Sequence, residues 1–362
     1  MDTNLKNLLV QGVEKGVFPG GAAAVSWGSG AERKMARAFA GIKDIRYPNE
    51  PVKEDTFFDL ASLSKALSTT LIVYSLIEEK KMGIDDTLQN LFNRDIPKDK
   101  QGITVRHLLS HSSGLISYKS YFKSLAPERS RRNRDVLLQY ILAEPLEYKP
   151  ETDCQYSDLG FILLGYIVEN LTGKALDINF EERVTAPFGL EKDIFYLPGT
   201  GTVADINKFA ATEDCPWRGR VMRAEVHDEH CWLMDGVSGH AGLFGRVEAV
   251  LSLCEQILDQ WQGRGKSCSW TGMLEQGLQK QYSNQTWCLG FDSPSVQVSS
   301  GGKYISSRSV GHLGYAGTSF WIDPDKQLVM VLLTNRIHPS RKKTKIRQFR
   351  PYFHNKVIEE FW

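Results

Sequence analysis

The spacing of hydrophobic residues changes within the first forty positions of the chain. Apolar residues recur at helical spacing over residues 4–16, and Phe18-Pro-Gly-Gly ends that helix. Residues 22–27 and 34–40 are short apolar runs, joined by the turn sequence Gly28–Gly30. The chain is therefore predicted to open with a helix and two antiparallel strands.

Three apolar stretches in the middle of the chain are predicted to be helices. They cover residues 62–82, 105–111 and 159–170. The middle of the chain should therefore be mostly helical.

Two short runs near the C-terminal end are rich in apolar and β-branched residues. Residues 319–322 and 328–333 are separated by Asp323-Pro-Asp-Lys-Gln, which is a turn sequence. This pattern predicts a hairpin of two buried strands, followed by an amphipathic closing helix over residues 349–362. Both ends of the chain thus contribute to one sheet, with a helical region inserted between them.

Composition and charge indicate an ordinary globular protein. Of the 362 residues, 41% are hydrophobic and 24% are charged. The formal net charge of +1 provides no overall field that would gather nucleic acid or an anionic membrane, so neither partner is expected. Two basic runs, residues 129–134 and 341–350, alternate with other residues in the manner of solvated helix faces.

The cysteines and the chain ends favour a cytoplasmic location. The six cysteines are widely spread without a C-x-x-C pair, which predicts reduced and mostly packed thiols. The N-terminal residues lack the pattern of a secretory signal, and no run reaches the roughly 18 apolar residues of a membrane span.

Ser62 and Lys65 form the first candidate catalytic pair. Spaced three residues apart, they lie on one face of the predicted helix, so the amine can take the serine proton. Burial or nearby positive charge would lower the lysine pKa far enough for this task. Ser62 would also stand at the helix start, near the positive end of the dipole. The simpler alternative is that Ser62 only caps the helix.

Other S-x-x-K sequences in the chain lack this setting. They begin at Ser120, Ser300 and Ser340, and none of them opens a buried apolar helix. Only the sequence at Ser62 therefore combines the pair with a buried helix start.

Two further motifs supply candidate site residues. Tyr156-Ser157-Asp158 precedes the apolar helix over residues 159–170, and a tyrosine beside an ammonium group can become phenolate-like and act as a base. A half-buried tyrosine at a helix start is the alternative. The sequence 311–318 leads into the first hairpin strand, where glycine allows a substrate to approach the backbone. Its N–H groups and that of Ser62 would form an oxyanion hole.

Together these motifs resemble the family of class C β-lactamases, penicillin-binding proteins, D-alanyl-D-alanine carboxypeptidases and related serine esterases. In that family S-x-x-K is followed by Y-x-N and then by K-T-G or H-x-G, and this chain keeps the order. The amino-acid sequences of four further stretches also resemble those of the family: residues 57–65, 104–115, 155–176 and 238–244.

The resemblance implies a fold, a mechanism and a set of roles. The fold is α/β (α+β), a mainly antiparallel sheet flanked by helices from residues 1–60 and 240–362, with a mostly helical region over 61–239 and the site in the cleft between them. No metal or organic cofactor is implied, and the substrate is a small acyl donor: a β-lactam, an ester or a D-amino-acid peptide. The implied roles are nucleophile for Ser62, proton transfer for Lys65 and Tyr156, third side of the site for His312 and Gly314, and second oxyanion amide for Tyr315.

The chain departs from the family pattern at Asp158 and His312. Asp158 replaces the asparagine of Y-x-N, and an ionised carboxylate cannot donate a hydrogen bond to substrate. Asp158 would instead bind Lys65 and raise its pKa. A neutral His312 would attract a substrate carboxylate less strongly than lysine does. Both departures favour an esterase or peptidase over an efficient β-lactamase.

Two alternatives to a serine hydrolase stay open at this point. A metal-dependent hydrolase is suggested by His107 and His111, four residues apart, and by the run His227-Asp-Glu-His-Cys231, although the glutamate of H-E-x-x-H is absent. A member of the fold that has lost turnover and serves as a binding or sensing module is the other, and Asp158 is its main support.

Overall fold

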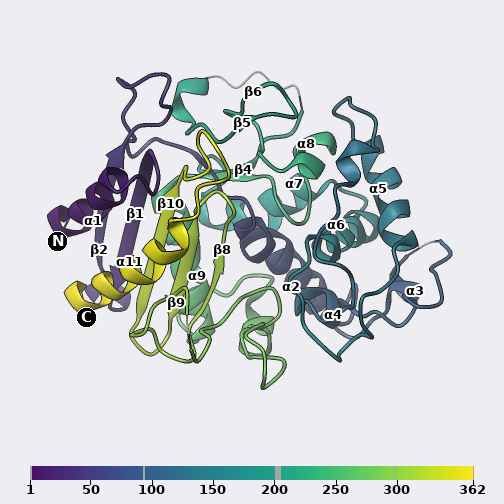
Figure 1. The fold of residues 1–362 in the computed structure, drawn as a ribbon. Coiled ribbons are helices and arrows are strands. Elements are labelled where there is room, and N and C mark those ends of the chain that lie inside the picture. The colour runs from purple at the N-terminus through teal and green to yellow at the C-terminus, as the bar shows by residue number, and fades with distance from the viewer. Residues whose placement is uncertain (1, 93, 200–204, 298, 362) are drawn as a thin grey trace.

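A five-stranded antiparallel sheet is formed by the two ends of the chain (Figure 1). The computed structural model describes residues 2–92, 94–199, 205–297 and 299–361. The strand order is β2-β1-β10-β9-β8, with Ala24 opposite Val331 in the central pair. The strands are β1 (Gly20–Trp27), β2 (Lys34–Gly41), β8 (Val310–Leu313), β9 (Ser319–Asp323) and β10 (Leu328–Thr334).

The sheet confirms the four strands expected from the sequence and adds one. The hydrophobic pattern alone did not predict a strand at residues 310–313, whereas the family resemblance places the H-x-G motif on a sheet strand; these residues form the edge strand β8, with Gly311 opposite Trp321 of β9. His312 therefore stands on a sheet edge, where its backbone is held in register.

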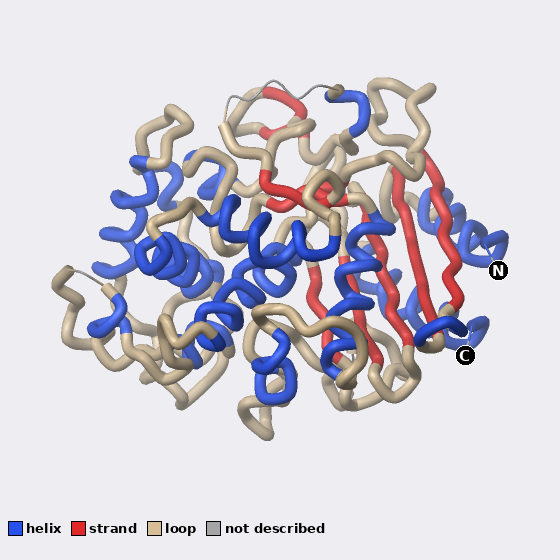
Figure 2. Tube along the Cα trace, turned by 180° about the vertical axis from the view of Figure 1, so that it is seen from behind, coloured by secondary structure: helices blue, strands red, loops and turns tan. Residues whose placement is uncertain are grey.

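Helices cover both faces of this sheet. Helices α1 (Asp2–Glu14) and α11 (Ile346–Phe361) pack on the face that carries Ala23 and Val25 (Figure 1). Helix α9 (Val247–Trp261) packs on the other face, against Ala22 and Ala24 (Figure 2). This alternation follows from the two-residue period of side chains along a strand. Helix α11 begins earlier than expected, and its predicted last residue, Trp362, lies outside the described residues.

The inserted region is mainly helical, as expected. The stretch predicted as one helix over 62–82 is a π-helical segment, Lys65–Thr70, that continues into α2 (Leu71–Glu78). The stretch over 105–111 is α4, and that over 159–170 is α6. The remaining bounds are α3 (Leu88–Leu91), α4 (Val105–Leu109), α5 (Arg132–Ala143), α6 (Asp158–Thr172), α7 (Leu176–Phe180), α8 (Glu229–Leu233) and α10 (Leu274–Gly277).

Two small antiparallel sheets, within the inserted region and at its two ends, were not expected. One has the order β3-β7-β4, and the other pairs β5 with β6. Because β3 ends just before Ser62 and β7 begins just after His240, the first sheet brings these two segments together. The strands are β3 (Phe58–Asp59), β4 (Ile194–Tyr196), β5 (Asp214–Cys215), β6 (Arg220–Val221) and β7 (Leu243–Gly245).

The largest buried cluster draws on both predicted regions. It includes Ala22 and Val331 of the sheet, Leu60, and Leu163 of α6, all essentially without exposed surface. The division into 1–60 with 240–362 and 61–239 stays a prediction. All six cysteines are free, and four of them are buried, which confirms the expectation of packed thiols.

Membrane-spanning segments were sought among the described helices. No single helix there is long and apolar enough to cross a membrane. Helix α6 with the segment Leu176–Phe188 meets the criteria of length and composition as a pair bent by 82°. Most residues of α6 are buried within the protein, as in the core helix of a globular protein.

The segment that carries Ser62 is held by the sheet edge. The hydroxyl of Thr318 donates a hydrogen bond to the Leu60 carbonyl (3.0 Å), and the N–H of Gly314 donates to the Thr318 carbonyl (2.7 Å). A Cβ at position 314 would lie 2.7 Å from the Leu60 carbonyl oxygen and would collide with the Thr318 hydroxyl. The glycine is thus required by packing within the protein, where the sequence suggested substrate approach.

Replacing this glycine should destabilise the protein. We expect Gly314→Ala to lower the free energy of unfolding by about 1–3 kcal/mol, because overpacking at a tight contact forces the backbone apart. The midpoint of urea unfolding measures the change. Gly102→Ala is the matched control, since a Cβ there meets nothing within 4 Å. Equal midpoints for the two variants would contradict this account of Gly314.

Candidate active site

A cavity of about 670 Å³ collects six of the seven residues that the motifs singled out. The seventh, Lys65, lies beneath the cavity with no exposed surface. The cavity-lining residues come from the Ser62 segment, the start of α6 and the sheet edge at β8, and they are Ser62, Tyr156, Asp158, His312, Gly314 and Tyr315.

The ammonium group of Lys65 contacts four residues, one of which is its hydrogen-bonding neighbour Tyr156. It donates hydrogen bonds to Ser62 Oγ (3.1 Å) and to the His240 carbonyl (3.0 Å). It also forms an ion pair with Asp158 Oδ1 at 2.7 Å. The predicted contact between Asp158 and Lys65 is therefore present. An ammonium group has three donors, so every one is used.

The pKa values differ from what the motifs alone suggested. Burial by itself lowers the pKa of Lys65, but Asp158 and Tyr156 outweigh it, so that the pKa is raised overall. Burial also raises the pKa of Tyr156, and the charge of Lys65 offsets this only in part. The expected partly neutral lysine and phenolate-like tyrosine are thus corrected. The resting pair is an ammonium and a neutral phenol, because Asp158 stabilises the lysine charge and the phenol is buried.

His111 supports Tyr156 from behind. Its Nδ1 accepts a hydrogen bond from the N–H of Ser157 (3.1 Å), and its ring centroid lies 4.8 Å from that of Tyr156. Burial, and then the positive charge of Lys65, hold the pKa of His111 well below its usual value. His111 is therefore an uncharged ring that packs against Tyr156 and holds the phenol in place.

The other member of the suspected metal pair, His107, is engaged elsewhere. Its Nδ1 accepts the N–H of Thr104 (3.1 Å), and its Nε2 contacts Glu151 at 2.8 Å. Both histidines thus have structural bonds, which accounts for their spacing without a metal site.

His312 is a neutral hydrogen-bonding group of the cavity wall. Its Nδ1 lies 3.0 Å from the Leu313 carbonyl, which can only accept, so Nδ1 carries the proton and Nε2 is left as an acceptor. Burial lowers the pKa of His312 to about 3, and the charge of Lys65 acts in the same direction. The expectation of a neutral imidazole agrees with this environment.

The two predicted oxyanion donors face no competing acceptor. Within the described residues, neither the N–H of Ser62 nor that of Tyr315 donates a hydrogen bond to the chain. The Tyr315 ring is half-exposed and stacks against the Arg336 guanidinium, 4.7 Å from the ring centroid. The backbone amides are thus free to bind a substrate oxygen, and the role itself stays a prediction.

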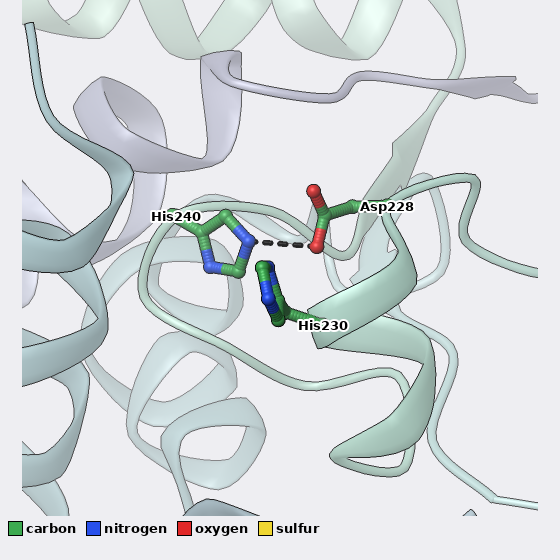
Figure 3. A group of neighbouring side chains, drawn as sticks. All are labelled: Asp228, His230 and His240. Carbon is green, nitrogen blue, oxygen red and sulfur yellow. Dashed lines mark hydrogen bonds and ion pairs between the residues drawn. The ribbon is translucent and has the colours of Figure 1, made fainter. Parts of the chain in front are cut away.

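The suspected metal run at residues 227–231 is divided by the fold. His227 contacts Glu213 (3.0 Å), and Arg341 donates to Glu229 (2.6 Å). The thiol of Cys231 donates to the Ala241 carbonyl. Asp228 and His230 instead form a group with His240, a residue that the sequence did not single out as a ligand (Figure 3).

An arginine-rich wall of the cavity was not anticipated. The basic run over residues 341–350 was interpreted as a solvated face, but Arg341, Arg347 and Arg350 line the cavity together with Arg336. Arg350 is 7% exposed and donates to the carbonyls of Gly314 and Thr318, both at 2.7 Å. The spacing of a basic run cannot distinguish a solvated face from a cavity wall, because the opposite wall is distant in sequence.

Comparisons with known proteins show the family of this chain. The family model described as Beta-lactamase matches residues 5–350. The chain is 31% identical over 347 residues to the N-acetylmuramyl-L-alanine amidase of Bacillus subtilis, covering 89% of this chain and 78% of the relative. It is 28% identical over 310 residues to an Escherichia coli K12 protein named provisionally as a D-alanyl-D-alanine carboxypeptidase, covering 80% and 71%.

The solved structures agree on the fold. A β-lactamase/D-alanine carboxypeptidase from Pseudomonas syringae superposes with a TM-score of 0.75 at 16% identity, covering all of this chain and 99% of that one. The α/β architecture with an antiparallel sheet is thereby confirmed. With the family model spanning nearly its whole length, the chain belongs to the beta-lactamase family of serine hydrolases.

Proposed function

We propose that the protein hydrolyses an amide bond in a small peptidoglycan-like peptide through an acyl-enzyme at Ser62. The observation that carries the proposal is the 3.1 Å contact between Lys65 Nζ and Ser62 Oγ, within a cavity wide enough for a peptide. The names of the relatives, an amidase and a carboxypeptidase, favour an amide among the three donor classes.

The Lys65–Tyr156 pair would accept and donate the protons in both acylation and deacylation of Ser62. The active form has lost one of the protons that the resting ammonium and phenol carry. Ser62 Oγ attacks the amide carbon and passes its proton to the pair, which gives it to the leaving nitrogen as the C–N bond breaks. Water then attacks the acyl carbon, and its proton returns through the pair to Ser62 Oγ. The net reaction consumes one water and releases an acid and an amine.

The arginine wall favours a substrate that carries a carboxylate. Among the described residues, Arg336, Arg347 and Arg350 have no carboxylate within 4 Å. Arg336 and Arg350 are fixed by backbone carbonyls, whereas the Arg347 side chain is exposed and forms no hydrogen bond within the described chain. Because His312 is neutral, Arg347 is the group best placed to attract an anionic substrate end.

Removing the nucleophile tests the central step. We expect Ser62→Ala to lower kcat by at least about a thousandfold, and to abolish the mass increase that a slowly released acyl donor leaves on the protein. Intact mass, peptide mapping and product release with an amide, a nitrophenyl ester and a penicillin provide the readouts. Ser120→Ala, in a second S-x-x-K sequence, is the matched control. If no donor gives an adduct or turnover in the wild type, the protein is a binding module.

Restoring the family asparagine at position 158 tests how Asp158 affects the protonation of Lys65 and Tyr156. Asp158 contributes to the raised pKa values of both Lys65 and Tyr156, so the active form should develop only at elevated pH. We expect Asp158→Asn to move the acidic limb of the kcat/KM profile to lower pH by about one unit or more. The profile is measured with the fastest donor. An acidic limb that stays in place or moves upward would show that Asp158 does not control these protons.

Neutralising Arg347 tests the anionic substrate end. We expect Arg347→Gln to raise KM about tenfold or more for a peptide with a free terminal carboxylate, since one charge-assisted contact is lost. The same variant should leave KM for the corresponding peptide amide unchanged. Lys342→Gln, an exposed neighbour outside the cavity, is the matched control. An equal effect of Arg347→Gln on both peptides would refute charge recognition at this position.

A further inference from the structure

His230 is a buried histidine whose ring nitrogens have no hydrogen-bond partner. It has no exposed surface, and neither of its ring nitrogens has a hydrogen-bond partner. Leaving a buried polar group without a partner costs about 1–3 kcal/mol, so such groups in native proteins call for a physical cause. The rings of Tyr118, Phe122 and Tyr121 surround it, with centroids 5.4, 5.7 and 6.2 Å from its own, and none of them satisfies its nitrogens.

Two side chains of the types that bind metal ions lie close to His230. One ligand atom from each of Asp228, His230 and His240 lies within 4.8 Å of the others. Figure 3 shows the His230 ring, carried by α8, beside the contact between His240 Nε2 and Asp228 Oδ1, which measures 2.8 Å. We propose that these three side chains bind one zinc-class divalent metal ion at the wall of the active-site cavity.

The donor set suits zinc. Two imidazoles and one carboxylate, with bonds of about 2.0–2.2 Å, are typical protein ligands for this ion. Tetrahedral bonds of that length place ligand atoms about 3.3 Å apart. The 2.8 Å distance between His240 Nε2 and Asp228 Oδ1 would therefore lengthen slightly, and the longest distance between two ligand atoms of the group would shorten. Such shifts lie within the reach of side-chain rotation.

The groups around the three ligands fix their orientation. His240 Nδ1 lies 2.8 Å from the hydroxyl of Ser238, which can donate or accept. When a metal ion binds the lone pair of Nε2, the imidazole proton is on Nδ1, and Nδ1–H donates a hydrogen bond to the Ser238 hydroxyl. The N–H of Cys231 donates to Asp228 Oδ1 (2.8 Å), which leaves Oδ2 available. Hydrogen bonds of this kind from neighbouring groups orient metal ligands in general.

The site would open toward the cavity. Asp228 and His240 line it, so a water molecule or a substrate group can supply the fourth ligand from that side. The nearby Cys231, Glu229 and His227 side chains have partners of their own and do not join the group. The backbone carbonyl of His240 accepts a hydrogen bond from Lys65, so one loop contacts both the proposed metal site and the lysine beside Ser62.

Metal stoichiometry and affinity test the proposal without reference to activity. The full-length protein is freed of metal with a chelator, loaded with Zn²⁺, gel-filtered and analysed for zinc by mass spectrometry, with affinity from calorimetry. We expect one zinc ion per chain in the wild type. His230→Phe, which keeps a ring within the aromatic surroundings, should weaken binding at least about a hundredfold. His354→Asn is the matched control, because it removes another buried histidine with an unpaired Nε2, on α11.

The outcomes separate a metal site from a folding effect. Loss of zinc in His230→Phe with a wild-type unfolding transition, and retention in His354→Asn, supports the proposal. If His230→Phe does not fold, the wild type decides: zinc should raise its unfolding temperature in a concentration-dependent manner. Sub-stoichiometric zinc in the wild type, or equal affinity in both histidine variants, would overturn the site.

Discussion

The structure of the site depends on the burial of one ammonium group. Lys65 has no exposed surface, and a buried charge without partners would cost about 3–5 kcal/mol. Its acceptors come from three separate parts of the chain: the turn at Ser62, the start of α6 at Asp158 and the loop at His240. Satisfying this charge therefore requires that these three segments meet at Lys65. The geometry of the proposed site and the packing of this region thus depend on the same contacts.

Asp158 determines whether the buried Lys65 carries its charge. An amide at this position would leave the lysine charge to be stabilised by neutral groups alone, and burial would then favour the neutral amine. The carboxylate at 2.7 Å opposes burial and keeps the charge. The chain thus has a stable ion pair between Lys65 and Asp158, but Lys65 is not a free base in the resting protein. The proposed amide hydrolysis therefore requires that Lys65 or Tyr156 loses a proton when the substrate binds.

The sequence predicted the parts whose signals are local. The periodic runs of β1, β10 and α6 and the spacing of Ser62 and Lys65 are visible within a few residues. Edge strand β8 has no periodic signal because it is short and contains glycine, and only the family resemblance indicated a strand there. The sheet β3-β7-β4 was missed because two- and three-residue strands have no periodicity. Arg347 and His240 were missed for another reason. Arg347 lines a cavity whose opposite wall is distant in sequence, and His240 meets Asp228 and His230 only because the intervening loop folds back, which no spacing rule predicts.

The loop of His240 shows how such distant parts are held in register. A Cβ at Gly239 would collide with the Phe161 carbonyl of α6, so only glycine lets the loop approach this helix. The hydroxyl of Thr69 donates to the Gly239 carbonyl (2.7 Å), which ties the loop to the segment that follows Lys65. The His240 carbonyl is thereby fixed relative to Asp158 at the start of the same helix. Because the His240 carbonyl contacts Lys65 and the His240 ring contacts Asp228, a shift of this loop would disturb both contacts at once, so the proposed catalytic roles require that the loop is rigid.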